Sequence, residues 1–390
     1  MMLAASGLTG SALAQAASSA GNKLKVDAYS RHLQWLRTAD EVAEATVEMG
    51  YDGVDITVRP YPGHVDPEKV ATDLPAFVNT IRKHGLQVVT ITSPITDADS
   101  PNAERILGTA SQLGITHYWW GTFRYDSTKP VMEQLDALKP RVEKLAKLNE
   151  KLKLKAMYHT YSGNMMVGSS MWDFLSVLRN FDPAYVGFHY DVGHMTNAGG
   201  NGTWEIPLRA AGPYIAGVSA KDSHFELDLH IPEGGPFTGT PESLSRFGGP
   251  GGGPPRAGAM PPGAAPGLQP PPPAPAAPTA ATPGPRAPGA GPTGRGPGAP
   301  APPGLGGGGQ PNPWRVKYVP LGEGNINLPR LAAILKEINF SGPIEVQAEY
   351  PNGGSENAMD KITLPREIVL GNLKHDRLTL KAGFSASGLL

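Results

Sequence analysis

The stretch that decides the fold opens with the apolar run Gly53-Val-Asp-Ile-Thr-Val58 and closes with a second one, Gln87-Val-Val-Thr-Ile-Thr92. Between them, residues 74–83 have the apolar spacing of an amphipathic helix. A strand, a helix and a strand in this order are typical of a parallel α/β unit. The alternation continues along the chain, with helices expected at 39–49, 102–113 and 130–152 and strands at 24–29, 114–119, 154–161, 186–191, 215–221 and 344–349.

These eight predicted strands favour a (β/α)8 barrel of the TIM type. Such a barrel takes about 250 residues plus loops, which suits the part of the chain that remains when two unusual segments are set aside. A doubly wound sheet is the alternative. However, no Gly-x-Gly-x-x-Gly motif follows the first strand, so nothing supports the dinucleotide-binding version of that fold.

The two unusual segments are a leader and an insertion. Residues 1–22 are uncharged and contain the small-residue run Ala12-Leu-Ala-Gln-Ala-Ala17, which is typical of a signal peptide, although a basic start is missing and a flexible leader is the alternative. Residues 248–313 contain 41 Gly plus Pro in 66 positions, so we expect a disordered insertion between the seventh and eighth strands. The barrel is then expected in two parts, at 23–247 and 314–390.

The composition excludes several classes of protein. The chain has no cysteine, which excludes a disulfide scaffold, a cysteine zinc site and thiol catalysis. Its net charge of −1 argues against nucleic acid as a partner, and no apolar run reaches the roughly 18–20 residues of a membrane-spanning helix. We expect a periplasmic or secreted protein without an integral membrane segment, and the sequence is compatible with a homo-oligomer.

Polar residues gather at the ends of the predicted strands, which is where the catalytic groups of such barrels lie. Charged side chains are seldom buried without partners, so this ring indicates a site rather than packing. Its members are Asp55, Arg59, His64, His159, Tyr161, Asp191, His194, Lys221, Asp222, His224 and Glu349.

Two strands show how the ring is built. The sixth, Tyr185-Val-Gly-Phe-His-Tyr-Asp-Val-Gly-His194, places Asp191 three residues before His194. That spacing lets both side chains approach one centre, although it also arises where an Asp caps a helix beside a structural His. The eighth, Gly342-Pro-Ile-Glu-Val-Gln-Ala-Glu-Tyr350, puts three polar residues on one face, namely Glu345, Gln347 and Glu349.

Several phrases run in order through the barrel parts of the chain. They are Gly50-Tyr-Asp-Gly-Val-Asp-Ile-Thr-Val-Arg-Pro60, Tyr158-His159, Asp191-Val-Gly-His194, Lys221-Asp222, Pro320-Leu-Gly-Glu-Gly324 and Glu349-Tyr-Pro351. With them the sequence resembles the sugar phosphate isomerase/epimerase family, the xylose-isomerase-like TIM barrels. The resemblance covers residues 25–381 except for the insertion.

The resemblance implies a divalent metal, Mn²⁺, Mg²⁺, Co²⁺ or Zn²⁺, at the ends of strands five to eight. Carried over by position, its ligands here are His159, Asp191 and Glu349. Many relatives have a further His two residues before Lys-Asp, where this chain has Ser219, and His224 is then the candidate for the remaining ligand. Tyr161 stands where some relatives have a second His.

The activity implied by the resemblance is isomerisation or epimerisation of a carbohydrate by metal-assisted proton transfer beside a carbonyl. Glu349 would act as the base, with His159 or His194 as the opposing acid/base or as a ligand, and with Lys221 stabilising the oxyanion. Trp119 is expected to form an aromatic wall for the sugar, although a purely structural role is the alternative. The expected substrate contacts are Asp55, Arg59, His64, Trp119, His194 and Asp222.

Three other functions are weighed against this one. The first is a 3-keto-glycoside lyase or hydrolase that uses the same enolate chemistry. The second is an apurinic-site endonuclease, against which the near-neutral charge and the leader argue. The third is a non-catalytic carbohydrate-binding barrel, because Ser219 and Tyr161 replace potential ligands.

Overall fold

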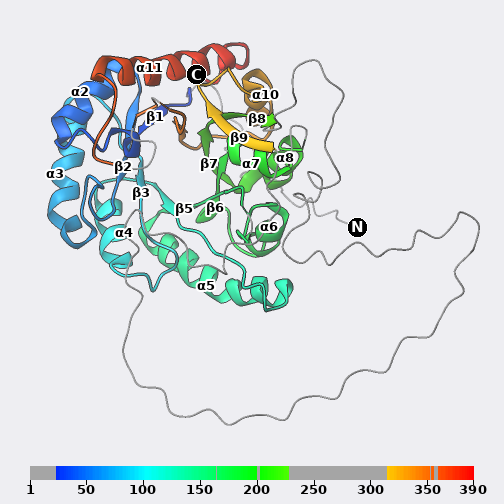
Figure 1. Ribbon diagram of the computed structural model, residues 1–390. Helices are drawn as coiled ribbons and strands as arrows, with labels where there is room; N and C mark the ends of the chain where they lie inside the picture. Colours follow the sequence, from blue (N-terminus) through cyan, green and yellow to red (C-terminus); the bar gives the residue numbers. More distant parts are fainter. Residues whose placement is uncertain (1–22, 164, 200–202, 228–313, 352, 355–358) are drawn as a thin grey trace, which may run out of the picture. The chain divides into compact units, whose positions relative to one another are not determined.

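The computed structural model describes residues 23–163, 165–199, 203–227, 314–351, 353–354 and 359–390 (Figure 1). The chain forms two compact units, Met1–Glu226 with Val316–Leu390, and Leu227–Arg315. The first unit contains the barrel. Most of the second unit lies outside the described residues, as do the predicted leader at 1–22 and the predicted insertion at 248–313.

Eight parallel strands close into a barrel in the order β1-β10-β7-β6-β5-β4-β3-β2. The sheet has no open edge, so the predicted (β/α)8 barrel is confirmed and the doubly wound alternative is excluded. The stretch after the seventh barrel strand, which contains residues 228–313, separates β7 from β10 as expected. The strands are β1 (Val26–Tyr29), β2 (Gly53–Thr57), β3 (Thr90–Thr92), β4 (His117–Trp120), β5 (Lys155–His159), β6 (Val186–Asp191), β7 (Ile215–Ala220) and β10 (Ile344–Val346).

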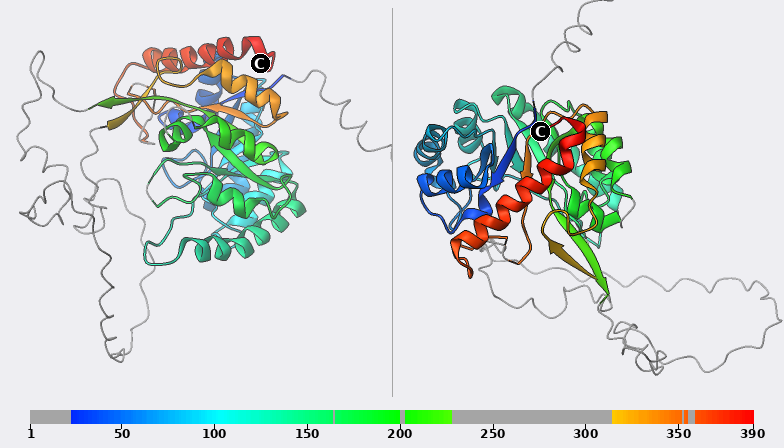
Figure 2. Two further views of the ribbon diagram at one scale, coloured as in Figure 1. Left: turned by 90° about the vertical axis from the view of Figure 1, so that its right-hand side faces the viewer. Right: turned by 90° about the horizontal axis from the view of Figure 1, so that it is seen from above.

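Helices surround the barrel on its outside, and Figure 2 shows this cover from two further sides. Among the described residues, none of these helices is both long enough and apolar enough to span a lipid bilayer. The helices are α2 (Ala39–Met49), α3 (Val70–Lys83), α4 (Ala103–Gln112), α5 (Val131–Leu152), α6 (Trp172–Leu178), α7 (Val192–Gly199), α8 (Glu205–Ala211), α10 (Leu328–Glu337) and α11 (Arg366–Phe384).

The bounds of α2 follow directly from its sequence. Thr38 caps the amino end, because its hydroxyl accepts the backbone N–H of Glu41 while the Glu41 carboxylate accepts the N–H of Thr38. Gly50 ends the helix with φ +77°, a left-handed conformation that costs glycine little. Both signals are readable in the sequence, and the predicted range is therefore the observed one.

Two strands were not predicted. β8 (Asp222–Leu227) follows β7 directly, and β9 (Trp314–Val319) precedes the loop that leads to α10. They form a separate two-stranded sheet outside the barrel. Tyr318 on β9 reaches the site described below, so this small sheet contributes to it.

The barrel strands present alternate residues to two environments. One set packs outward into the main core, as Val54 and Ile56 of β2 do. The other set faces the interior, where a small apolar cluster consists of Tyr29, Trp119, Met157 and Ala216. The same interior also holds buried polar side chains, namely Asp27, Asp55, His189, Ser219, Glu345 and Gln347.

Asp27 on β1 illustrates how a buried carboxyl group in this interior lowers the stability of the fold. Its Oδ1 accepts a hydrogen bond from Gln87 Nε2 at 2.8 Å, while its Oδ2 has no hydrogen-bond partner among the described residues. Burial raises the pKa of Asp27 to about 7. Between its unfolded pKa of about 3.9 and that value, the folded state keeps a proton that the unfolded chain has lost. The contribution of Asp27 to stability therefore falls as the pH rises through this window.

Replacing Asp27 with Asn is expected to raise the free energy of unfolding at neutral pH by on the order of 1–3 kcal/mol. The amide has no charge to desolvate, and its oxygen keeps the hydrogen bond from Gln87. The gain should grow with pH up to about 7 and then level off. Urea unfolding at a series of pH values measures it, with Asp136→Asn on the exposed surface of α5 as the control. A gain that does not vary with pH would contradict the prediction.

Candidate active site

The candidate site lies at the carboxyl ends of four neighbouring strands. His159 ends β5, Asp191 ends β6, Lys221 follows β7 and Glu349 follows β10 by three residues. Parallel strands all point the same way, so their ends meet at one mouth of the barrel. His194 joins them from the first turn of α7, because Asp191 Oδ1 accepts its backbone N–H at 2.8 Å and holds that turn against the strand end.

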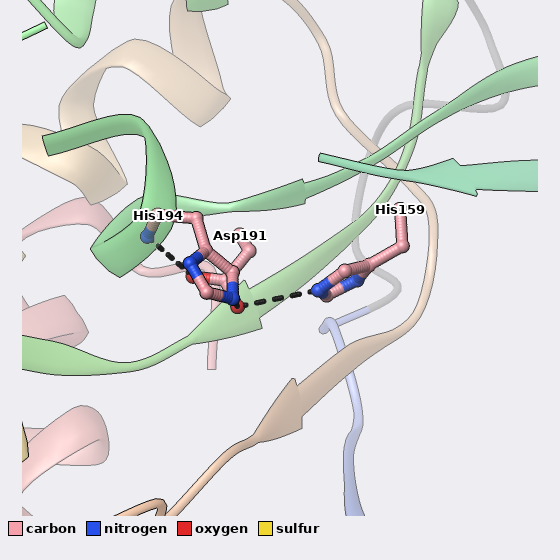
Figure 3. Close-up of side chains that lie close together, drawn as sticks. All are labelled: His159, Asp191 and His194. Atoms are coloured by element: carbon pink, nitrogen blue, oxygen red, sulfur yellow. Dashed lines mark hydrogen bonds and ion pairs between the residues drawn. The ribbon is translucent and has the colours of Figure 1, made fainter. Parts of the chain in front are cut away.

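His159, Asp191 and His194 form a buried cluster (Figure 3). Both imidazoles lie close to the same carboxylate oxygen, with His159 Nε2 3.4 Å and His194 Nε2 3.7 Å from Asp191 Oδ2. One ligand atom from each residue lies within 4.8 Å of the others. Two imidazole nitrogens and one carboxylate oxygen at this spacing make a donor set for a divalent metal.

Lys221 brings a fourth group to the cluster. Its Nζ lies 3.0 Å from Asp191 Oδ2 and 2.8 Å from Glu349 Oε2. Burial would lower the pKa of the ammonium, but the two carboxylates outweigh it and raise the pKa above its usual value. Burial would likewise raise the pKa of Asp191 and of Glu349, but Lys221 lowers both. All three groups are therefore charged at neutral pH.

The two histidines of the cluster are neutral. Burial and the adjacent Lys221 lower the pKa of His194 to about 3, and burial lowers the pKa of His159. His194 Nδ1 lies 2.9 Å from Ser162 Oγ and 3.4 Å from the Tyr318 hydroxyl. Neutral imidazoles have a free nitrogen lone pair, which is what both metal binding and proton transfer need.

His159 packs against aromatic side chains. It stacks on Trp119 with the ring centroids 4.1 Å apart, and Tyr161 packs against it edge-on at 4.4 Å. The guanidinium of Arg59 lies 5.9 Å from the Trp119 ring. Trp119 is 3% exposed, so in this state it is a wall behind His159 rather than an open platform.

Asp55 lies deeper in the barrel. It accepts a hydrogen bond from Thr92 Oγ1 at 2.7 Å, and burial raises its pKa to about 6. Its neighbour Glu345 is also buried, and burial together with Asp55 raises the pKa of Glu345 well above its usual value. The charge of one carboxylate disfavours ionisation of the other, which adds to the effect of burial on the pKa of Glu345.

Three further residues that the sequence suggested have other partners. His224 lies on β8, with Nε2 3.0 Å from Glu226 Oε1, and it is not part of the His159, Asp191 and His194 cluster. His64 Nε2 lies 3.0 Å from the carbonyl oxygen of Leu36. Asp222 accepts backbone N–H groups from four residues, namely Ser223, Gly322, Gly324 and Ile326.

The sequence analysis did not assign a role to every group at the site. Ser162 and Tyr318 both contact His194, and His189 Nδ1 lies 3.4 Å from His159 Nδ1. A signal for His189 was present, because it lies two residues before Asp191 on the same face of a strand. Tyr318 had no signal of this kind, because its strand follows the insertion and belongs to no barrel repeat.

The environment of Asp191 Oδ2 also supports a divalent metal at this site. Asp191 Oδ2 is buried between the two imidazoles and accepts no well-directed hydrogen bond from the described residues. A buried carboxylate oxygen without a hydrogen bond is costly unless an ion contacts it. Lys221 Nζ meets this oxygen as an ion pair at 3.0 Å, and a carboxylate oxygen has a further lone pair that can bind a metal.

Several solved structures share this fold. They include a crystal structure of the IOLI protein with a bound zinc atom, which is 12% identical over 93% of this chain and 99% of that one, with a TM-score of 0.54. D-psicose 3-epimerase from Clostridium cellulolyticum H10 with D-tagatose is 12% identical over 93% of this chain and 99% of that one, with a TM-score of 0.55. The 3-keto-D-glucoside 4-epimerase YcjR from E. coli is 12% identical over 91% of this chain and 100% of that one, with a TM-score of 0.51. At this identity the likeness shows the fold alone.

The sequence comparisons give the family. A search of curated proteins found no significant match. The sequence profile of the xylose isomerase-like TIM barrels matches residues 43–251, which is more than half of the chain. The chain therefore belongs to the family of xylose isomerase-like TIM barrels.

Proposed function

We propose that this protein is a sugar isomerase or epimerase that moves a proton at the carbon beside a carbonyl group. The observation that carries the proposal is the triad of Asp191, Lys221 and Glu349, in which one ammonium lies between two carboxylates at the mouth of the barrel. A reaction of this kind needs a base, and it needs a positive group where charge develops on oxygen. The family and the epimerases among its structural neighbours support the same reaction class.

Glu349 is the proposed base. It is ionised because Lys221 lowers its pKa, and its side chain remains 24% exposed, so it can meet a substrate that enters from solvent. Lys221 stabilises the oxyanion that forms when the proton leaves. His159 is the opposing acid/base in a site where its ring does not bind the metal, because its neutral ring can accept and return a proton but its one free lone pair cannot also bind an ion.

His159, Asp191 and His194 would hold the metal, which when bound acts as a Lewis acid toward the carbonyl and hydroxyl oxygens of the sugar. Two imidazoles and one carboxylate favour Zn²⁺ or Co²⁺ over Mg²⁺, because Mg²⁺ prefers oxygen ligands. Glu349 is linked to the cluster through its ion pair with Lys221. To join the metal ligands, His224 would have to break its contact with Glu226.

Arg59 and Trp119 are the proposed substrate contacts, because the Arg59 guanidinium lies 5.9 Å from the Trp119 ring and that ring stacks on His159. Asp55, His64 and Asp222 already have partners within the protein, which favours a supporting role for them. We extend the proposal to the location of the protein, which the leader at 1–22 suggests is periplasmic or secreted.

The experiment is to incubate the purified protein with Zn²⁺ and with a panel of ketoses and 3-keto-glycosides in D₂O, and to follow the substrates by NMR. The proposal expects deuterium at the carbon beside the carbonyl without bond cleavage. Cleavage of the glycosidic bond would overturn it in favour of the lyase or hydrolase. Sugar binding without exchange or cleavage would overturn it in favour of the carbohydrate-binding barrel.

A further inference from the structure

Lys221 lies where a cation would bind the cluster. Its side chain is 1% exposed, and its Nζ lies 3.0 Å both from Asp191 Oδ2 and from His194 Nε2. Asp191 and His194 are two of the three residues that would hold a metal. A buried ammonium is costly unless it is paired, so Lys221 satisfies the negative charge of Asp191 when no metal is bound.

The contact with His194 defines a competition. A lysine ammonium has only donors, so His194 Nε2 must be the acceptor and the ring proton must be on Nδ1. That proton then faces Ser162 Oγ at 2.9 Å, which completes the arrangement. An imidazole nitrogen has one lone pair, and Nε2 can therefore accept from Lys221 or bind a metal, but it cannot do both.

We propose that Lys221 is a built-in competitor for the metal, so that the ammonium and a divalent ion occupy the His159, Asp191 and His194 cluster in turn. The inference deepens the proposed function, because it assumes that this cluster is the metal site. The competition involves charge as well as the lone pair, because a second positive group beside Asp191 repels the ammonium.

Lys221 keeps partners when a metal enters. Glu349 Oε2 lies 2.8 Å from Nζ, and the ring of Tyr318 lies 4.8 Å away. Neither residue belongs to the cluster, so the ammonium can turn toward them and release His194. Metal loading then brings the charge of Lys221 toward Glu349, the proposed base, and couples the two parts of the site.

The test is the affinity for Zn²⁺, measured by titration calorimetry on protein stripped with a chelator. Lys221→Met is expected to bind one Zn²⁺ about tenfold or more tightly than the unsubstituted protein, because the competitor is gone. Lys221→Arg keeps the charge and should not bind more tightly. Lys317→Met, on the exposed part of β9 and paired with Glu226, removes a lysine elsewhere and should leave the affinity unchanged.

An affinity of Lys221→Met that equals or falls below that of the unsubstituted protein would overturn the inference, provided that circular dichroism shows a folded protein. Should that variant fail to fold, Lys221→Met is combined with Glu349→Gln, which restores the net charge, and compared with Glu349→Gln alone. The double variant must then bind Zn²⁺ about tenfold more tightly. No sugar is needed, so this result is independent of the isotope exchange that tests the proposed function.

Discussion

Replacing Glu349 with Gln is expected to slow deuterium exchange into the substrate by on the order of 10²–10⁴-fold, the usual contribution of a positioned general base. The amide has the shape of the carboxylate but cannot accept the proton. It also keeps an oxygen that can accept a hydrogen bond from Lys221, which now lies 2.8 Å from Oε2. The loss should therefore appear in kcat rather than in KM.

The matched control is Glu337→Gln on α10, where the carboxylate pairs with Arg209 on the surface. It should exchange at the rate of the unsubstituted protein. The thermal unfolding temperature of both variants separates a lost base from a lost fold. Exchange that continues at a similar rate in folded Glu349→Gln would transfer the role of base to another group, of which His159 is the nearest candidate.

Replacing Asp191 with Asn is expected to lower the free energy of unfolding by about 3 kcal/mol and to abolish tight Zn²⁺ binding. Removing one partner of a buried ion pair leaves the other charge uncompensated, and such changes cost about 3–5 kcal/mol. The lower end applies here because Lys221 keeps Glu349 as a partner. The proposed metal site would lose its carboxylate oxygen, which lies 3.4 Å from His159 Nε2 and 3.7 Å from His194 Nε2.

Urea unfolding and zinc calorimetry measure the two effects. Asp99→Asn is the control, because Asp99 also pairs with a lysine, Lys144, but both side chains are exposed. Surface pairs contribute about 0–1 kcal/mol, so this variant should stay close to the unsubstituted protein. An Asp191→Asn protein that keeps its zinc affinity would place the metal outside the cluster.

Periodicity made most of the fold predictable. The range 186–191 agrees with β6, and 39–49 agrees with α2, because an apolar run or a cap marks both ends of each element. The other barrel strands are shorter than predicted. Strands such as β10 end earlier because their polar ends leave the hydrogen-bonded ladder at the mouth, whereas β1, β3 and β4 begin two or three residues later than predicted. Strands β8 and β9 were missed because no repeat of the barrel requires them.

The site was predictable to the extent that strand position decides it. His159, Asp191, Lys221 and Glu349 were expected together at the mouth, and the structure brings them together. From the sequence, His224 was expected as the remaining metal ligand and His194 as a substrate contact. The structure puts His194 in the cluster because Asp191 caps the turn that carries it, whereas His224 extends along β8 toward Glu226.

Asp222 connects the two ends of the long segment between β7 and β10. Its carboxylate binds Ser223, where the chain leaves the barrel, and also Gly322, Gly324 and Ile326, where the chain returns. Gly324 has no room for a side chain, because a Cβ there would overlap the Asp222 carboxylate. One side chain thus holds the two ends of this segment together. Once the ends are held, each doubling of the segment's length costs only about 0.6 kcal/mol in loop-closure entropy. Sequence can therefore be gained or lost there in evolution without disturbing the residues at the barrel mouth.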